Sequence, residues 1–269
     1  MRRRIAASAD WSQGRNNFVI EAFFFGPDES RVFATYHPPA DGSGRALTVI
    51  CPPLFSEYMR TQLALRQVAI GLAEQGHHVL RIDYRGTGDS YGELASTTIS
   101  DWVADVALAV QEGRDLTGNA TIRLLGVRAG ALLACKAAGS LQGINRVVLW
   151  DPVPDGEGYL KLLRRLQADV VARNLYLNRA VRREALGECA GYVLSPRMIE
   201  EFRQLDAATY GEIPKDSLRV VLTSPHTAAP VPGVTGEVTP FICNWETATD
   251  DLLVPRPVME RLIACLVQS

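Results

Sequence analysis

The sequence lacks several features that mark common classes of protein. Its 269 residues carry a formal net charge of −2, so no overall field favours nucleic acid as a partner. No apolar run is long enough to span a bilayer. The basic segment 1–4 precedes no long apolar stretch, so we expect a frayed, solvated tail and no secretory signal. These absences predict a globular protein of the cytoplasm with no integral membrane segment.

Cysteine and histidine are also sparse. The five cysteines are scattered, odd in number and without a Cys-x-x-Cys spacing. This pattern indicates free thiols in a reducing compartment and gives no support for a zinc site. No histidine follows His226. We therefore expect neither a metal nor a cofactor.

The sequence does contain a regular alternation of strands and helices. Short apolar runs predict strands at 18–25, 31–37, 46–51, 79–83, 121–125, 146–150, 218–223 and 238–243. Amphipathic periodicity predicts helices at 60–75, 100–112, 129–138, 159–177, 196–205 and 255–267, with Ser100 as an N-cap. Such an alternation favours right-handed crossovers and a parallel sheet covered on both faces.

The alternation stops between about 156 and 206, where only helical periodicity is found. We interpret 154–213 as a helical lid inserted into a core formed by 1–153 and 214–269. The insertion is rich in basic side chains, namely Lys161, Arg164, Arg165, Arg173, Arg179, Arg182 and Arg183. A charge run is usually a solvated helix face, but here it also fits an acidic ligand or an acidic partner protein.

One local motif organises the chain. An apolar run ends in Gly126-Val127-Arg128-Ala129-Gly130, and an Ala/Leu-rich helix follows at once. This is the outline of a nucleophile elbow, Gly-x-Ser-x-Gly, in which a sharp turn raises one side chain above a parallel sheet. The raised residue here is Arg128, a permanent cation without a lone pair for attack on a carbonyl. The motif therefore predicts the fold more firmly than it predicts hydrolysis.

Motifs along nearly the whole chain resemble the α/β-hydrolase superfamily. They include Asp-Tyr-Arg-Gly-Thr-Gly-Asp-Ser at 83–90, the elbow at 126–134, Trp-Asp-Pro-Val at 150–153 and Gly-Tyr-Val-Leu-Ser-Pro at 191–196. More narrowly, the chain is similar to the exosortase A system-associated hydrolases, type 2. The resemblance implies an α/β-hydrolase fold, with a mostly parallel sheet of about eight strands, helices on both faces and a helical lid. It also implies a bacterial protein of a biosynthetic pathway.

The usual triad of this superfamily runs in the order serine, acid, histidine. The nucleophile position holds Arg128, the acid position falls in 223–226, and the base position falls in 243–246. None of these places holds the expected group, so the sequence predicts that the usual triad is missing.

Several residues remain candidates for the site. We expect Arg128, Asp151, His226 and Glu246 to act on a ligand or substrate, and Leu54, Ser56, Glu57, Val127 and Ala129 to line the binding site. Two interpretations of Arg128 stay open. It could be a structural arginine paired with Asp151 or Asp83, or an anion receptor at a helix N-terminus.

Three functions follow from these candidates. The preferred one is a non-canonical or non-catalytic homologue that binds an anionic small molecule or a partner protein. The second is an esterase, thioesterase or acyl-transfer enzyme with a displaced nucleophile, Ser56 or Cys51, and His226 as base. The third is a cyclase or lyase in which Arg128 polarises a carbonyl and Asp151 or Glu246 moves a proton.

Overall fold

The computed structural model describes most of the chain. The described residues are 3–5, 20–42, 44, 46–118, 120–174, 176, 178, 181, 187–223, 231–249 and 251–268. His226 lies outside them.

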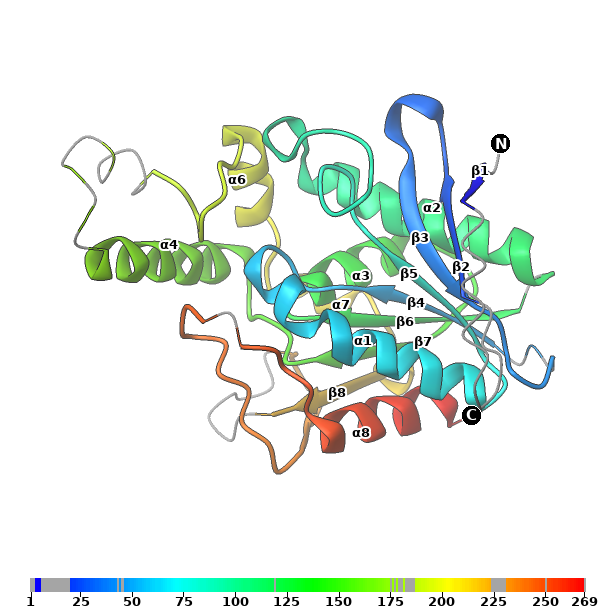
Figure 1. The fold of residues 1–269 in the computed structure, drawn as a ribbon. Coiled ribbons are helices and arrows are strands. Elements are labelled where there is room, and N and C mark those ends of the chain that lie inside the picture. Colours follow the sequence, from blue (N-terminus) through cyan, green and yellow to red (C-terminus); the bar gives the residue numbers. More distant parts are fainter. Residues whose placement is uncertain are drawn as a thin grey trace, which may run out of the picture.

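The strands form one nine-stranded sheet in the order β1-β2-β3-β5-β4-β6-β7-β8-β9. They are β1 (Arg3–Ile5), β2 (Glu21–Phe25), β3 (Val32–His37), β4 (Ala46–Cys51), β5 (His78–Ile82), β6 (Thr121–Val127), β7 (Ile144–Trp150), β8 (Leu218–Leu222) and β9 (Glu237–Val238). The run from β5 to β9 is parallel, whereas β1, β2 and β3 add antiparallel strands at one edge. The predicted mostly parallel sheet is confirmed (Figure 1).

Helices cover both faces of the sheet. They are α1 (Ser56–Glu74), α2 (Ile99–Thr117), α3 (Ala129–Ser140), α4 (Gly156–Arg173), α6 (Pro196–Arg203), α7 (Ala208–Gly211) and α8 (Arg256–Val267), with short 3-10 turns at Asp28–Ser30, Leu94–Ser96 and Lys215–Ser217. Alternate strand residues pack against α1 and α8 on one face and against α2 and α3 on the other. Across the described residues, no helix combines the length and apolar composition needed to cross a membrane.

Three predicted details are wrong. The cap of α2 is Thr98, whose hydroxyl accepts from the N–H of Asp101 while the Asp101 carboxylate accepts from the N–H of Thr98, a capping box. The strand predicted at 238–243 is reduced to the short β9, because Pro240 cannot donate to the sheet ladder. Part of the predicted N-terminal tail, Arg3–Ile5, pairs with β2 as β1.

Among the described residues between β7 and β8 lie the helices α4, α6 and α7, in line with the helical periodicity of the sequence. Helix α4 projects from the carboxyl edge of the sheet, and α6 lies near it (Figure 1). Between them Cys189 and Tyr192 form an isolated antiparallel bridge that closes a tight turn. Ala190 and Gly191 at the centre of this turn both have positive φ, 51° and 84°. The turn holds Tyr192 at the mouth of the site described next.

Candidate functional site

The elbow has the sharp geometry that the motif predicted. Arg128 stands between β6 and α3 with φ 53° and ψ −124°, a strained conformation for a residue with a side chain. A Cβ added at Gly130 would lie 2.2 Å from the carbonyl oxygen of Pro52, so that position requires glycine. Phe55 forms a second turn of the same kind between β4 and α1, with φ 57° and ψ −134°. Because β4 and β6 are neighbours, the two turns lie side by side.

The Arg128 side chain points into the protein and is 7% exposed. Its Nε donates to Oε1 of Glu57 at 3.2 Å, and its Nη1 donates to the backbone carbonyl of Asp151 at 3.0 Å. The guanidinium also lies over the ring of Trp245, 4.9 Å from its centroid. Of the two interpretations, the contacts favour a structural pair, but the carboxylate is that of Glu57 rather than of Asp151 or Asp83.

Glu57 is buried between two donors. Its Oε1 accepts from Arg128, and its Oε2 accepts from the hydroxyl of Tyr159 at 3.1 Å. Burial raises the pKa of Glu57 above its ordinary value, although Arg128 and Tyr159 act in the opposite direction. Burial is the largest single effect on the pKa of Arg128 and acts to lower it, but the charges of Glu57, Tyr159 and Asp151 and the hydrogen bond to Glu57 together raise that pKa. The two side chains therefore form a buried ion pair at the elbow.

Asp151 directly follows β7, and its carboxylate accepts three hydrogen bonds. Its Oδ1 accepts from the N–H of Thr223 at 2.8 Å, and its Oδ2 accepts from the indole Nε1 of Trp245 at 2.7 Å and from the Thr223 hydroxyl. Trp245 comes from the segment where the base was expected. A carboxylate, an indole and a guanidinium thus lie in sequence from Asp151 through Trp245 to Arg128.

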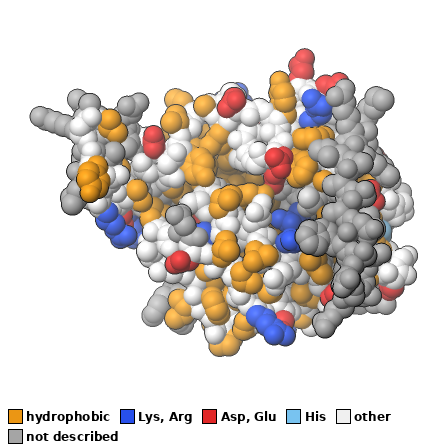
Figure 2. Space-filling view, in the orientation of Figure 1, with side chains coloured by type: hydrophobic (Ala, Val, Ile, Leu, Met, Phe, Trp, Pro, Cys, Tyr) orange, Lys and Arg blue, Asp and Glu red, His pale blue; other side chains and the backbone are white. Residues whose placement is uncertain are grey.

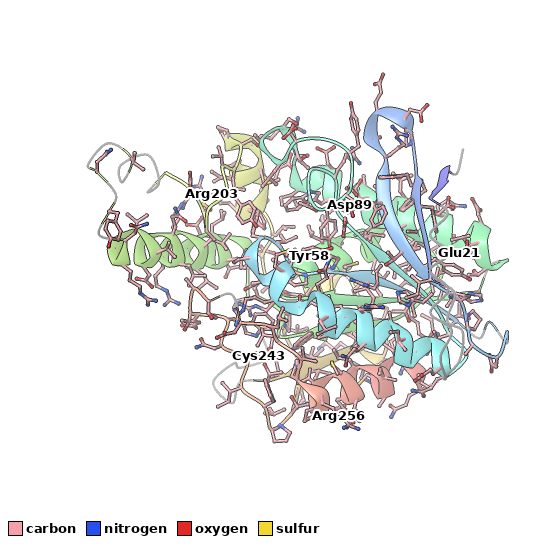
Figure 3. The ribbon with its side chains drawn as sticks, in the orientation of Figure 1. Glu21, Tyr58, Asp89, Arg203, Cys243 and Arg256 are labelled. Carbon is pink, nitrogen blue, oxygen red and sulfur yellow. The ribbon has the colours of Figure 1, made fainter. Side chains whose placement is uncertain are left out.

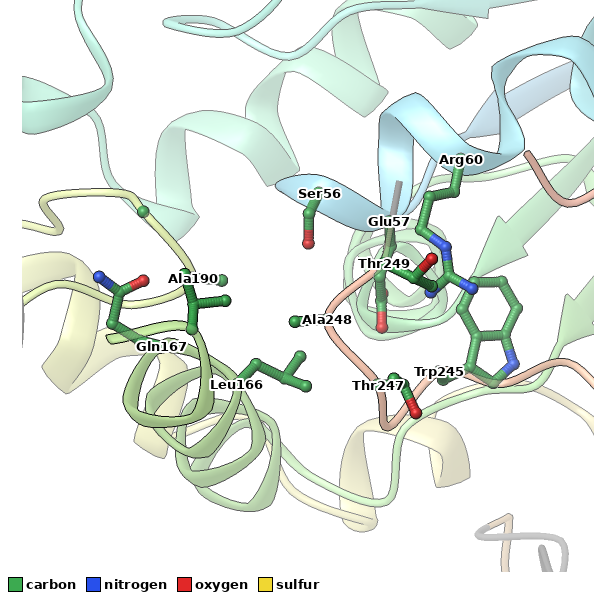
Figure 4. A pocket seen from close by; sticks show the side chains of 12 residues that line it. Ser56, Glu57, Arg60, Leu166, Gln167, Ala190, Trp245, Thr247, Ala248 and Thr249 are labelled. Atoms are coloured by element: carbon green, nitrogen blue, oxygen red, sulfur yellow. The ribbon is translucent and has the colours of Figure 1, made fainter. Parts of the chain in front are cut away.

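A cavity of about 300 Å³ opens above this arrangement, and we call it the polar cavity. Its wall includes Ser56, Glu57, Arg60, Gln167, Trp245 and Thr249 (Figure 4). α1 provides the first three of these residues, α4 provides Gln167, and the segment before α8 provides the last two.

Arg60 is the cation that lines the polar cavity. Arg60 is 4% exposed. Its guanidinium lies over the ring of Trp245, with the guanidinium carbon 5.8 Å from the ring centroid. Nη2 donates to the carbonyl of Asn244 at 2.9 Å and Nε to that of Asp251 at 3.3 Å. Burial lowers the pKa of Arg60, with Glu57 acting against this shift. In the described part of the chain, Arg60 forms no ion pair with a carboxylate.

The predicted site residues are only partly brought together. Ser56 and Glu57 line the polar cavity, and Leu54 lines a neighbouring cavity. Val127 and Ala129 are buried in the core on either side of the elbow. These two hold the turn in place.

Glu246, which the sequence suggested as a residue of the site, has a solvent-exposed side chain. Its side chain is 74% exposed and pairs with Arg165 of α4 at 3.0 Å. Arg60, Tyr159 and Trp245, which the sequence reasoning did not single out, contribute more to the site. The spacing of Glu57 and Arg60, one helical turn apart, was the signal available for Arg60.

The displaced thiol proposed as a nucleophile is poorly suited to that role. Cys51 is fully buried, and burial raises its pKa to about 12, so thiolate is scarce at neutral pH. Asp83 and Asp89 belong to the loop after β5, where Asp83 Oδ2 accepts from the N–H of Asp89 at 3.0 Å. Among the described residues, no group of three or more His, Cys, Asp or Glu side chains could hold a metal ion.

The sheet order, the strained elbow and the covering helices are those of the α/β-hydrolase superfamily. Within it, the chain belongs to the serine aminopeptidase S33 family, whose model matches residues 47–225. No curated protein matches the sequence.

Several solved structures share the fold of this chain. An esterase of Pyrococcus furiosus, Pf2001, is similar at 17% identity with a TM-score of 0.61, over 93% of this chain and 90% of that one. Est1E of Butyrivibrio proteoclasticus, solved with ferulic acid, is similar at 17% identity and a TM-score of 0.59, over 90% and 95%. Mouse α/β-hydrolase domain-containing protein 10 is similar at 17% identity with a TM-score of 0.54, over 91% of this chain and 96% of that one. At such identities the likeness concerns the fold alone.

Proposed function

We propose that this chain is a non-hydrolytic member of its family and binds a small molecule with an anionic group in the polar cavity. The observation that carries the proposal is the buried pair of Arg128 and Glu57 at the elbow. The apex residue already has its partner, and its side chain cannot attack a substrate.

The line from Asp151 to Arg128 supports this proposal because its middle member cannot accept a proton and pass it on. In a triad the histidine accepts the nucleophile's proton while the acid orients the ring. Trp245 holds the corresponding place between Asp151 and Arg128, but an indole is a donor only. His226, outside the described residues, stays a predicted base without a located partner.

Arg60 is the residue that we assign to the anion. A guanidinium buried without a carboxylate of its own gains most from an anionic ligand, since charge-assisted hydrogen bonds are strong in a desolvated site. Glu57 lies nearby, but Arg128 already holds it. A carboxylate is the simplest group that matches one guanidinium.

The helical segment 154–213 serves in this proposal as the lid. Helix α4 contributes Leu166, Gln167 and Val170 to the polar cavity, and its basic side chains add positive potential at the rim. The narrower resemblance to exosortase-associated hydrolases, a bacterial biosynthetic setting, a partner protein and a cytoplasmic location remain predictions from the sequence.

Three measurements test the function. Labelling with a fluorophosphonate and turnover of nitrophenyl esters should both stay at background, and stoichiometric labelling of Ser56 would overturn the proposal. Short carboxylates such as butanoate should raise the melting temperature of the protein. Arg60→Gln should remove that shift, whereas Arg256→Gln, which alters an exposed arginine paired with Glu260, should leave it.

A second candidate function rests on Glu57. A buried carboxyl group with a raised pKa that lines a cavity is a typical proton carrier. In a cyclase or lyase, Glu57 would then move the proton, in place of the predicted Asp151 or Glu246. Glu57→Gln would abolish such turnover but retain ligand binding, whereas a binding protein has no turnover to lose.

A further inference from the structure

A second cavity, of about 330 Å³, lies next to the polar cavity. We call it the apolar cavity. Its wall includes Leu54, Phe55, Met59, Leu94, Trp102 and Tyr192. The two cavities adjoin at two short segments, because Phe55 faces one and Ser56 the other, and Tyr192 faces one and Gly191 the other.

We propose that the ligand is an amphipathic carboxylate, whose head group binds Arg60 and whose hydrocarbon tail occupies the apolar cavity. This inference rests on the proposed function, because it assigns a class of ligand to the same site.

The aromatic part of the apolar cavity's lining offers a tail rings whose polar atoms are bonded elsewhere, although Thr87 and the exposed Glu93 also line the cavity. The Tyr58 hydroxyl donates to Asp83 at 2.5 Å, the Tyr84 hydroxyl donates to the carbonyl of Pro52 at 3.4 Å, and the Trp102 indole donates to the carbonyl of Arg85 at 2.9 Å. Figure 3 shows Tyr58 on α1 close to the loop that carries Asp89. With their polar tips already bonded, these rings favour a hydrocarbon.

The boundary between the cavities is narrow. The rings of Phe55 and Tyr192 lie 5.1 Å apart, centroid to centroid. Phe55 is fixed by its strained turn and by Tyr159 and Trp102, which pack on it. Tyr192 is fixed by the turn 189–192, whose backbone bonds are 2.9 and 3.1 Å. The two rings are in contact, so a tail that runs from Arg60 into the apolar cavity has to pass beside this pair and not between its rings.

The mouth of the apolar cavity has exposed apolar side chains beside the exposed Glu93. Met59 lines the cavity and is 61% exposed, and Val193 beside Tyr192 is exposed to a similar degree. Figure 2 shows hydrophobic side chains gathered across the middle of the face that carries α1, with few charged ones among them. Exposed apolar side chains grouped at a cavity indicate a site for an apolar ligand.

The experiment measures the affinity of the protein for acetate, butanoate, hexanoate and octanoate by calorimetry. Affinity should rise about fourfold for each methylene that enters the cavity. 1-Octanol, which has the tail without the charge, should bind at least tenfold more weakly than octanoate. Affinity that does not change with chain length, or octanol as tight as octanoate, would overturn the inference.

Variants separate the tail from the head group. Leu94→Trp should fill the apolar cavity and remove the dependence on chain length, while acetate binding stays as in the wild type. The matched control is Leu63→Trp, also on the surface but outside both cavities, which should keep that dependence. If Leu94→Trp does not fold, Met59→Asp at the mouth should weaken octanoate at least tenfold and leave acetate unchanged. An unchanged response to chain length in either variant contradicts the tail assignment.

Failure of the proposed function gives a different result. If Arg60→Gln leaves the binding of acetate and butanoate intact, Arg60 is not the anion receptor, whatever the dependence on chain length. If Arg60→Gln removes short-acid binding and the wild type shows no gain with length, the proposed function stands and the amphipathic ligand is wrong.

Discussion

Strand β6 has a buried arginine near each of its ends, and the two differ in their hydrogen-bond and ion-pair partners. Arg128 follows the carboxyl end and Arg123 lies near the amino end, each 7% exposed. Arg128 pairs with Glu57. Arg123 faces Arg146 across the ladder to β7, and neither forms an ion pair within the described residues. The Nε and Nη1 atoms of Arg123 have no hydrogen-bond partner there.

Burial alone does not determine the direction in which the pKa of a guanidinium shifts. Burial lowers the pKa of Arg123, and Arg146 lowers it further. At Arg128 burial has the same lowering effect, but the charges of Glu57, Tyr159 and Asp151 and the hydrogen bond to Glu57 together raise the pKa. Arg146 has one compensation, since its Nη1 donates to the carbonyl of Cys265 near the C-terminus of α8 at 3.0 Å. The buried cation at the carboxyl end of β6 therefore has a carboxylate partner, whereas the one at the amino end has none among the described residues.

The largest effect is expected from Arg128→Met. This change leaves the buried carboxylate of Glu57 without its cation, so the free energy of unfolding should fall by about 3–5 kcal/mol. Urea denaturation followed by circular dichroism measures it. Adding Glu57→Leu should restore much of the loss, since no unpaired charge then remains. A single variant as stable as the wild type would show that the pair contributes nothing.

Another buried basic side chain, His37, sharpens the comparison because it can give up its proton. Burial lowers its pKa from 6.5 to about 3, with Arg81 and Arg66 adding to the shift. Between these values the unfolded chain binds more protons than the folded one. Stability should therefore be complete above pH 6.5 and fall by up to about 1.4 kcal/mol per pH unit as the pH drops toward 3.

Urea denaturation between pH 4 and 7 checks this dependence. His37→Gln has no titrating ring and should make the curve flatter in that range. An equal slope in the variant and the wild type would assign the acid sensitivity to other groups.

The same substitution at the amino end of β6 should act in the opposite direction. Arg123→Met removes a charge that has no carboxylate partner and relieves Arg146 of a like charge, so stability should rise by about 1 kcal/mol. Thermal unfolding compares it with Arg128→Met. If both substitutions destabilise the protein equally, the contrast between the two ends of β6 is lost.

The smallest effect is expected at an exposed pair. Glu246→Gln breaks the contact with Arg165 of α4, and stability should change by less than about 0.5 kcal/mol, because both groups remain solvated. Butanoate binding should also be unchanged. A loss of binding would return Glu246 to the site that the sequence first suggested.

The sequence could predict what is encoded locally. Gly126 and Gly130 flank Arg128 within five residues, and the alternation of apolar runs and helices gave most of the sheet. The partner of Arg128 could not be predicted in this way, because Glu57 is 71 residues distant and only the sheet order brings it near. Arg60 looked like an ordinary helix residue, because its partners, the carbonyls of Asn244 and Asp251, are far away in the sequence.

The two strained turns, at Phe55 and Arg128, have an electrostatic consequence. Each starts a helix, α1 or α3, and the adjacency of β4 and β6 brings both helix starts to one place. The positive ends of two helix dipoles thus converge there. Glu57, in the first turn of α1, is a resident anion at this focus. The two helix dipoles therefore stabilise negative charge at that point, and the carboxylate of Glu57 provides it.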